Sequence, residues 1–190
     1  MEIEIKSLTP DLLNDYLFFF DNMVFSENPD WSKCYCYSFH FTGTSGQWNK
    51  DSNRAAVISM INDSTLKGYL AYSDDKPIGW CNANDRKNFQ ALDRYYDVDD
   101  KEPDLVCSIV CFLISPDHRR QGIAQKFLSQ VNEDYSSQGY DYLEAYPGKG
   151  DLSCEKHYKG PLSLYKKLGF KTYKEFKDYL VVRKYLENQT

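Results

Sequence analysis

A nearly unbroken apolar run, Leu105 to Ile114, constrains this chain more than any other feature, because a helix signal follows it directly. A strand with apolar side chains on both faces must be covered on both faces, so it lies inside a sheet rather than at its surface. Pro116 ends the strand. The segment from about Gln121 to Ser137 then has apolar residues at helical spacing and stops before Gly139. This strand–loop–helix unit predicts a mixed α/β fold with helices flanking the sheet.

The rest of the chain predicts further strands and helices around this unit. Thr9 and Pro10 are typical of a helix start, and the turn-forming SDDK lies between two strand-like segments within 68–83. The expected order is β-α-α-β-β-β-α-β-α-β-β, with antiparallel hairpins at both ends, and we expect one domain over residues 1–190. The expected strands are 2–7, the two within 68–83, 105–114, 140–146, 170–177 and 179–186, and the expected helices begin near residues 10, 52, 121 and 161.

Composition and charge argue against several classes of protein. The chain has 190 residues, of which 42% are hydrophobic and 27% charged, as is typical of a globular domain and not of a disordered one. Its net charge of −5 argues against a general nucleic-acid binder. The first residues lack the features of a secretory signal, and the apolar run Tyr16 to Phe20 is too short to span a bilayer. We therefore expect a cytoplasmic protein, monomeric or homodimeric, with no nucleic-acid or membrane partner.

The six cysteines fit a reducing compartment, in which most of them would act as small buried hydrophobic residues. Cys34 and Cys36 form a C-x-C pair and, with His40, could hold zinc, which would make the chain a metal protein. This spacing is unlike that of the common zinc sites, so we expect no metal. The six are Cys34, Cys36, Cys81, Cys107, Cys111 and Cys154.

The loop between the central strand and the long helix has the chemistry of an anion site. Gly122 and Ala124 are small, which lets a ligand approach the backbone closely. The helix start offers unpaired N–H groups and the positive end of its dipole, and Arg119 and Arg120 add charge there. The phosphate motifs G-x4-G-K-[ST] and G-x-G-x-x-G are both absent. A ligand that carries phosphate fits this loop; the alternative is an ordinary turn with two surface arginines.

This loop, residues 119–124, resembles the R/Q-x-x-G-x-G/A acyl-CoA signature of the GNAT superfamily of N-acyltransferases. The segments FLISP before it, LSLYKKLGF after it, and WCNA after the DDKP turn are also similar to that superfamily, and they occur in the right order. The resemblance covers nearly the whole chain. It implies a mixed, mostly antiparallel sheet with a splayed central parallel strand pair and flanking helices. It also implies an enzyme that transfers an acetyl group from acetyl-CoA to a primary amine by direct attack in a ternary complex.

The resemblance further implies where acetyl-CoA binds. Its pyrophosphate is expected on the backbone amides of the loop, and its pantetheine arm along the end of the central strand, like an extra strand. Splaying of that strand from 140–146 frees N–H groups that can bind the amide arm and the thioester oxygen. The expected cofactor-binding residues are Phe112, Leu113, Ile114, Arg119, Arg120, Gln121, Gly122, Ile123 and Ala124.

Catalytic roles follow from matching positions. Tyr165 stands where many members have a tyrosine near the CoA sulfur, so we expect it to be the general acid that protonates the departing thiolate; the alternative is that it only packs. The chain departs from the family pattern just before it, where Tyr158 and Pro161 replace the usual Asn and Ala. Glu144, acting through water, is the candidate base, and the alternative is a solvent-exposed strand residue. Weaker candidates are His40 and His157 as bases and Cys111 as an acyl-carrying thiol.

The acceptor is expected to enter beside the first two helices and the last hairpin, near 175–178. Residues 31–48 are rich in aromatic and hydroxyl groups, which suit a small amine with an apolar body. The acidic stretch 93–104 could attract a cationic amine, or be no more than a solvated face. Two alternatives stay open: a peptide or protein N-acetyltransferase, and a CoA-binding module without turnover. The expected substrate-binding residues are Trp31, Tyr35 and Tyr37.

Overall fold

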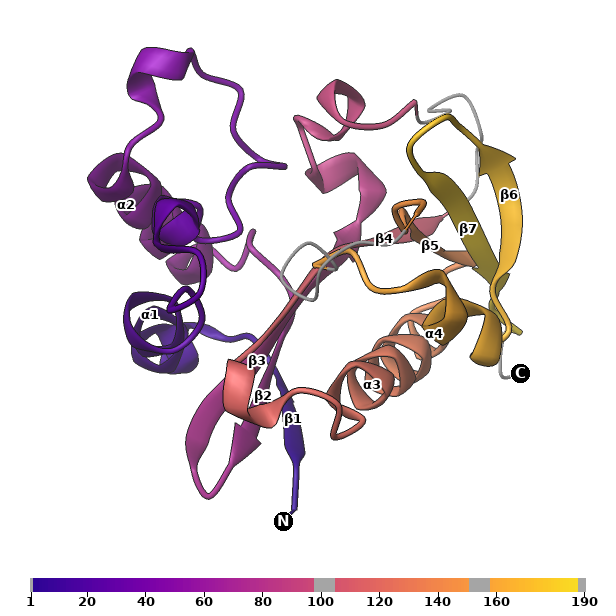
Figure 1. The fold of residues 1–190 in the computed structure, drawn as a ribbon, viewed down its shortest axis with the longest axis horizontal. Helices are drawn as coiled ribbons and strands as arrows, with labels where there is room; N and C mark the ends of the chain where they lie inside the picture. Colours follow the sequence, from indigo (N-terminus) through magenta and orange to yellow (C-terminus); the bar gives the residue numbers. More distant parts are fainter. Residues whose placement is uncertain (1, 98–104, 151–157, 188–190) are drawn as a thin grey trace.

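The computed structural model describes residues 2–97, 105–150 and 158–187. Its strands are β1 Glu4–Ser7, β2 Tyr69–Ser73, β3 Lys76–Asp85, β4 Val106–Ile114, β5 Tyr142–Ala145, β6 Lys171–Glu175 and β7 Leu180–Tyr185. Its α-helices are α1 Leu13–Asn22, α2 Lys50–Asn62, α3 Ile123–Ser137 and α4 Leu162–Lys167. Within these ranges the strands form a seven-stranded sheet in the order β1-β2-β3-β4-β5-β7-β6 (Figure 1).

The described part of the sheet is antiparallel except between β4 and β5. β4 pairs with β3 from Cys107 to Ile114. On its other side it pairs with β5 only over residues 106–109, opposite residues 142–145. Beyond this point the two strands separate, so residues 110–114 of β4 have no strand beside them on that side within the described ranges. The predicted splay of a central parallel pair is therefore confirmed.

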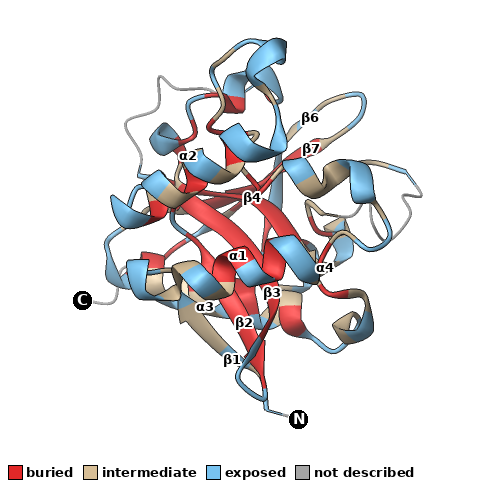
Figure 2. Cartoon of the chain, turned by 90° about the vertical axis from the view of Figure 1, so that its left-hand side faces the viewer, coloured by how far each residue is buried: buried red, intermediate tan, exposed pale blue. Residues whose placement is uncertain are grey.

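Helices cover both faces of the sheet. α1 and α2 lie on one face, and α3 and α4 lie on the other (Figure 1). On the first face the ring of Tyr16 from α1 packs edge-to-face on Trp80 of β3, with ring centroids 4.9 Å apart. On the second face Phe127 of α3 is fully buried in a cluster that includes Leu143 of β5. β4 supplies side chains to both clusters because alternate residues point to opposite faces, and it is buried over most of its length (Figure 2).

The element order and fold class predicted from the sequence are confirmed, and the local differences have simple causes. The first helix begins with a 3₁₀ turn, Pro10–Leu12, and the side chain of Thr9 forms no capping hydrogen bond. The segment after β3 contains two 3₁₀ turns, Arg86–Asn88 and Leu92–Arg94, which are too short to give a periodic pattern. Most of the acidic stretch considered for substrate attraction, residues 98–104, lies outside the described residues.

Candidate active site

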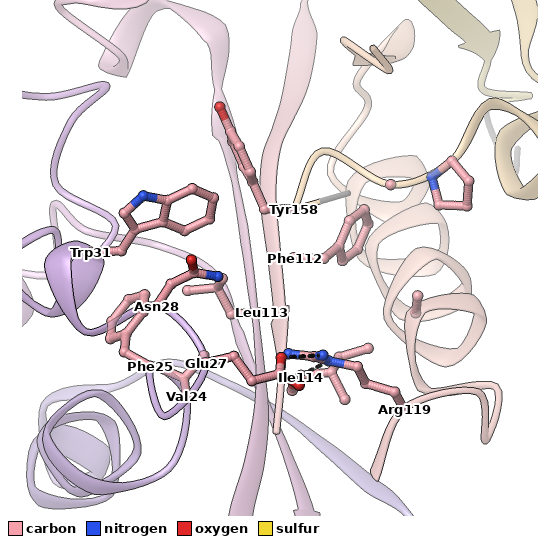
Figure 3. A pocket seen from close by; sticks show the side chains of 13 residues that line it. Val24, Phe25, Glu27, Asn28, Trp31, Phe112, Leu113, Ile114, Arg119 and Tyr158 are labelled. Atoms are coloured by element: carbon pink, nitrogen blue, oxygen red, sulfur yellow. Dashed lines mark hydrogen bonds and ion pairs between the residues drawn. The ribbon is translucent and has the colours of Figure 1, made fainter. Parts of the chain in front are cut away.

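A cavity of about 140 Å³ opens where β4 separates from β5 (Figure 3), and we call it the first pocket. Its walls are the end of β4, the loop that leads into α3, residues 24–31 after α1, and residues 158–161 before α4. Five of the nine residues expected to bind acetyl-CoA line it, namely Phe112, Leu113, Ile114, Arg119 and Ala124. The strand–loop–helix unit recognised in the sequence therefore forms one side of a real cavity.

Among the residues that the structure describes, one backbone contact crosses the gap beside β4. The N–H of Phe112 points away from β3 and donates to the carbonyl of Tyr158 at 2.5 Å. At Phe112, the backbone of Tyr158 thus accepts the hydrogen bond that a neighbouring strand would otherwise accept. A ligand that pairs with the same N–H must replace this hydrogen bond, because a buried backbone donor is costly when it is left without a partner.

The loop into α3 is shaped by two residues with left-handed backbone. Arg120 has a φ of 61° and Gly122 has a φ of 79°, and α3 begins at Ile123. A Cβ at Gly122 would meet nothing within 4 Å, so glycine serves here for its backbone angle and not to avoid a clash. The first-turn amides of α3 have no carbonyl inside the helix to bind, and this suits an anion.

Arg119 lies across the mouth of the first pocket. Its Nε donates to the carbonyl of Ile114 at 3.2 Å, and its guanidinium pairs with Glu27 at 2.5 Å (Figure 3). These contacts hold a positive charge beside the loop and tie the end of β4 to the segment after α1. Gln121 is exposed and donates to a backbone carbonyl of the same loop, whereas the side chain of Ile123 is buried in the core. What Ile123 can offer a ligand is its backbone amide.

A second pocket, about 340 Å³ in volume, adjoins the first. The two share the side chains of Phe25, Trp31, Leu113 and Tyr158 as walls. Apart from Ser38, the remaining walls of the second pocket are aromatic, sulfur-bearing or charged, namely Asp30, Lys33, Phe39, Trp48 and three cysteines. The end of β4 therefore borders both pockets, and the second pocket extends along the segment 30–39.

Of the three residues expected to bind the acceptor, Trp31 lines both pockets, and the other two line neither. The ring of Trp31 packs edge-on against Tyr158, with centroids 5.8 Å apart. Tyr35 is fully buried, and its hydroxyl donates to Asp21 of α1. Tyr37 borders a separate hollow on the surface. Tyr35 and Tyr37 therefore pack near the first helices and do not border the two pockets.

Tyr165 of α4 is fully buried behind a wall of the first pocket. Its hydroxyl donates to the carbonyl of Lys159 at 2.7 Å. A Cβ on Gly160, a residue that lines the first pocket, would lie 2.9 Å from the same hydroxyl. Burial raises the pKa of Tyr165 well above its ordinary value of 10.0, so the hydroxyl keeps its proton at neutral pH. The protonated hydroxyl of Tyr165 is thus separated from the first pocket by the backbone at Gly160.

Glu144 is only 1% exposed, so the interpretation of this residue as a solvent-exposed one is wrong. Its carboxylate accepts from Arg183 Nε at 2.6 Å and from the hydroxyl of Tyr146 at 2.6 Å. Nη1 of Arg86 lies 3.6 Å from it. Glu144 lines neither pocket, and its partners join β5 to β7 and to the 3₁₀ turn after β3.

A family model of the acetyltransferase (GNAT) domain matches residues 65–172. The chain belongs to this family. The matched region runs from just before β2 into β6 and includes the loop before α3, so the resemblance seen in the sequence is confirmed. A comparison with curated proteins finds no match.

Solved structures show the same GNAT fold at low sequence identity. One is the PaiA N-acetyltransferase of Thermoplasma acidophilum in complex with coenzyme A, at 13% identity over 97% of this chain and 99% of that chain, with a TM-score of 0.57. Another is the ribosomal-protein-S18-alanine N-acetyltransferase of Escherichia coli, at 12% identity over 97% and 94%, with a TM-score of 0.54. A third is yncA of Salmonella typhimurium with its cofactor acetyl-CoA, at 13% identity over 98% and 95%, with a TM-score of 0.54.

Of the other titratable candidates of this GNAT domain, Cys111 lines the second pocket, whereas His40 lines neither pocket. His40 is 5% exposed, its Nδ1 lies 3.2 Å from a backbone carbonyl, and burial lowers its pKa to about 4. Cys34 and Cys36 line the second pocket while His40 borders another hollow, and no three His, Cys, Asp or Glu side chains of the described residues are grouped to hold a metal ion. His157 lies outside the described residues. In the ranges that the structure covers, no helix is both long and apolar enough to cross a membrane.

Two residues that line both pockets were not predicted for the site. Phe25 follows the apolar stripe of the first helix, and nothing in its spacing separates it from a core residue. Tyr158 stands out in the sequence only as a departure from the usual GNAT pattern before Tyr165. The structure shows that this departure puts an aromatic ring between the two pockets.

Proposed function

We propose that this GNAT protein transfers an acetyl group from acetyl-CoA to the primary amine of a small molecule, by direct attack of the amine in a ternary complex. The observation that carries the proposal is the junction of the two pockets beside the unpaired half of β4. Because the pockets share walls, donor and acceptor can meet there without a covalent enzyme intermediate.

Acetyl-CoA is the co-substrate, and the first pocket and its loop fit the parts of this molecule. Phe112, Leu113 and Ile114 offer a strand edge with which the pantetheine arm would pair, in place of the hydrogen bond from Phe112 to Tyr158. The loop 119–124 offers backbone amides and two arginines to the pyrophosphate. Lys167 of α4 adds a further positive charge, since its Nζ lies 3.1 Å from Gln125 in the first turn of α3.

The second pocket suits an amine with an apolar body. Trp31, Phe39 and Trp48 offer flat apolar surfaces, to which a cation can also bind. Asp30 attracts a cationic amine toward these walls. The volume of about 340 Å³ falls in the range of small-molecule sites, roughly 300–1,000 Å³. An aromatic pocket of this size favours a small molecule over a protein surface as the acceptor.

Tyr165 is the proposed general acid. Its protonated hydroxyl lies directly behind Gly160, and it must leave the carbonyl of Lys159 to protonate the departing sulfur. Glu144 is not proposed as the base, because its carboxylate is held between two arginines. The amine instead loses its proton to water before it attacks.

Calorimetry with acetyl-CoA tests the donor side. Gly122→Glu should abolish binding, because it puts a negative charge where the pyrophosphate belongs. Gly139 at the other end of α3 is a matched control: its φ is 77° and a Cβ there would also meet nothing within 4 Å. Gly139→Glu repeats the backbone strain and the charge change and should leave binding intact. Absence of binding by the wild-type protein at millimolar acetyl-CoA would overturn the proposal.

A thiol-release assay across a panel of small amines tests the acceptor side. We expect CoA release that depends on the amine, and a higher KM for the amine in Trp31→Ala. Tyr37→Ala is the control, because this aromatic residue belongs to the same stretch but lines neither pocket. Turnover of an unstructured peptide with none on small amines would reverse the choice of acceptor. Acetyl-CoA binding without turnover of any acceptor would indicate a CoA-binding module.

A further inference from the structure

Three cysteines line the second pocket, and the proposed acetyl transfer uses none of them. Cys34 and Cys36 follow the 3₁₀ turn Pro29–Lys33, and Cys111 belongs to β4. Cys111 stands opposite Asn82 in the register of β4 on β3, and Asn82 also contacts the sulfur of Cys36, so the two cysteines are neighbours in the wall of the pocket. All three are free thiols.

The sulfur of Cys36 has a hydrogen-bond donor on β3. Nδ2 of Asn82 donates to this sulfur at 3.3 Å. Asn82 is completely buried, so water does not compete for its amide. A donor held at a sulfur favours the thiolate form of that sulfur.

The three thiols consequently differ in acidity. Burial alone raises the pKa of the Cys36 thiol, but hydrogen bonding at its sulfur outweighs burial and lowers the pKa below the ordinary value. The neighbouring Cys36 sulfur and burial raise the pKa of Cys111. Burial raises the pKa of Cys34 to about 11. Together with the amide donor at its sulfur, these directions favour Cys36 as the reactive thiol of the pocket.

The backbone at Cys36 is held in an unfavourable conformation. Tyr35 and Cys36 both have positive φ, 46° and 53°, which residues other than glycine rarely adopt. The hydroxyl of Tyr16 donates to the carbonyl of Tyr35 at 2.6 Å, and Asn82 donates to the carbonyl of Cys36 at 3.3 Å. Contacts that hold a strained turn in place at a reactive side chain point to a function of that side chain.

We propose that Cys36 is a peroxide-reactive thiol and that Cys111 is its resolving partner, so that oxidation closes a disulfide between them in the wall of the second pocket. A reactive thiol next to a second thiol, reached through a cavity, is the arrangement found in redox-sensing cysteines. The oxidant is a small hydroperoxide that enters the second pocket.

The chemistry takes two steps. The Cys36 thiolate attacks an oxygen of the hydroperoxide, the O–O bond breaks, and Cys36 becomes a sulfenic acid while the leaving oxygen takes up the proton that the thiol had released. The Cys111 sulfur then attacks the Cys36 sulfur, the S–O bond breaks, and the hydroxyl leaves as water with the proton of Cys111. The two thiols lose two electrons in all, and the peroxide gains them.

The bond would tie the segment 34–36 to β4 beside the acceptor space. It lies away from the loop 119–124, so acetyl-CoA affinity should not change. Turnover of the amine should fall by about tenfold or more, because small displacements at a reacting centre lower rates steeply. This loss of turnover rests on the proposed function, whereas formation of the disulfide does not.

Peptide mapping of the full-length protein tests the bond directly. The reduced protein is treated with hydrogen peroxide, alkylated, digested with trypsin and analysed by mass spectrometry. We expect the loss of two thiols, a Cys36–Cys111 link, and recovery of both thiols with dithiothreitol. Each of these cysteines shares its tryptic peptide with another one, Cys34 or Cys107, so fragment-ion spectra are needed for the assignment.

Cys34→Ser is the matched control, because it removes a thiol of the same pocket that is held protonated; it should oxidise like the wild type. Cys111→Ser should stop at a sulfenic acid on Cys36 that dimedone traps, and Cys36→Ser should lose the fast reaction. Wild-type protein that keeps both thiols in peroxide, or that links Cys34 instead, would overturn the proposal. A Cys36–Cys111 link in a protein that turns over no amine would uphold this proposal and count against the proposed function.

Discussion

Replacing Tyr165 by phenylalanine tests the proposed chemistry most sharply, because the change keeps the ring and removes one proton. The ring contacts Phe170 and Phe112, with centroids 5.1 and 6.4 Å away, and phenylalanine preserves both contacts. What is lost is the hydrogen bond of 2.7 Å from the hydroxyl to the carbonyl of Lys159.

The structural and the catalytic consequences of Tyr165→Phe differ in size. One neutral hydrogen bond contributes about 1 kcal/mol to stability, which for a chain of this length corresponds to a Tm lower by about 2–4 °C. Loss of a general acid lowers kcat by about 100-fold, the low end of its usual contribution. That loss corresponds to about 2.7 kcal/mol of activation free energy. The catalytic effect therefore exceeds anything that the lost structural hydrogen bond can explain.

Tyr135 offers a matched control for this experiment. Its buried hydroxyl also donates to a backbone carbonyl, that of Ala83 at 3.2 Å, and it lines neither pocket. Tyr135→Phe should lower Tm by a similar amount and leave kcat unchanged. Thiol release at saturating substrates gives kcat, and thermal denaturation gives Tm. If Tyr165→Phe keeps kcat within a few-fold of the wild type, the acid role is refuted and water is the proton source.

Three other perturbations have defined outcomes. Gly122→Ala should weaken acetyl-CoA binding only modestly in calorimetry, because its Cβ has open space and the left-handed backbone costs about 1 kcal/mol. Glu144→Gln should lower the free energy of unfolding in urea by about 3–5 kcal/mol, because it removes a buried negative charge that pairs with two arginines; a loss of kcat in the folded protein would revive Glu144 as a base. His40 has a pKa of about 4 in the folded chain and 6.5 ordinarily, so between these values the unfolded chain binds the extra proton. Stability should therefore fall as the pH drops from about 6.5 to 4, and His40→Gln should flatten that part of the urea-derived curve.

The central unit could be predicted from the sequence because each of its signals is local. The apolar run 105–114 reports burial on both faces, and Gly122 and Gly139 mark the two ends of α3. The same local signals set the position of the loop, which is why the loop and the end of β4 were predicted to border a ligand site. The spacing of apolar residues along the chain carries this information, and it does not depend on residues far away in the sequence.

The acceptor side could not be predicted in the same way, because the segment 26–48 has no repeating pattern. Its order comes from short turns, among them Pro29–Lys33 and Ser45–Gln47, that aim neighbouring aromatic residues in different directions. Trp31 consequently lines the pockets, whereas Tyr35 points into the core beneath α1. Composition alone shows an aromatic stretch and does not show which rings face a ligand.

The burial of Glu144 was not predicted for a related reason, and its contacts join the strands next to the splay. The hydroxyl of Tyr146 donates to Glu144 and lies 2.8 Å from Ser108 Oγ on β4, while Arg183 on β7 donates to the other carboxylate oxygen. This buried network holds β4, β5 and β7 together up to the residues at which β4 and β5 part. The ring of Tyr96 stacks on Tyr146 of this network, with centroids 4.1 Å apart. The polar network thus lies at the end of the paired region, and the pockets begin where β4 has no further strand beside it among the described residues. A short stretch of sequence cannot predict this network, since Glu144 and Arg183 are 39 residues apart in the chain.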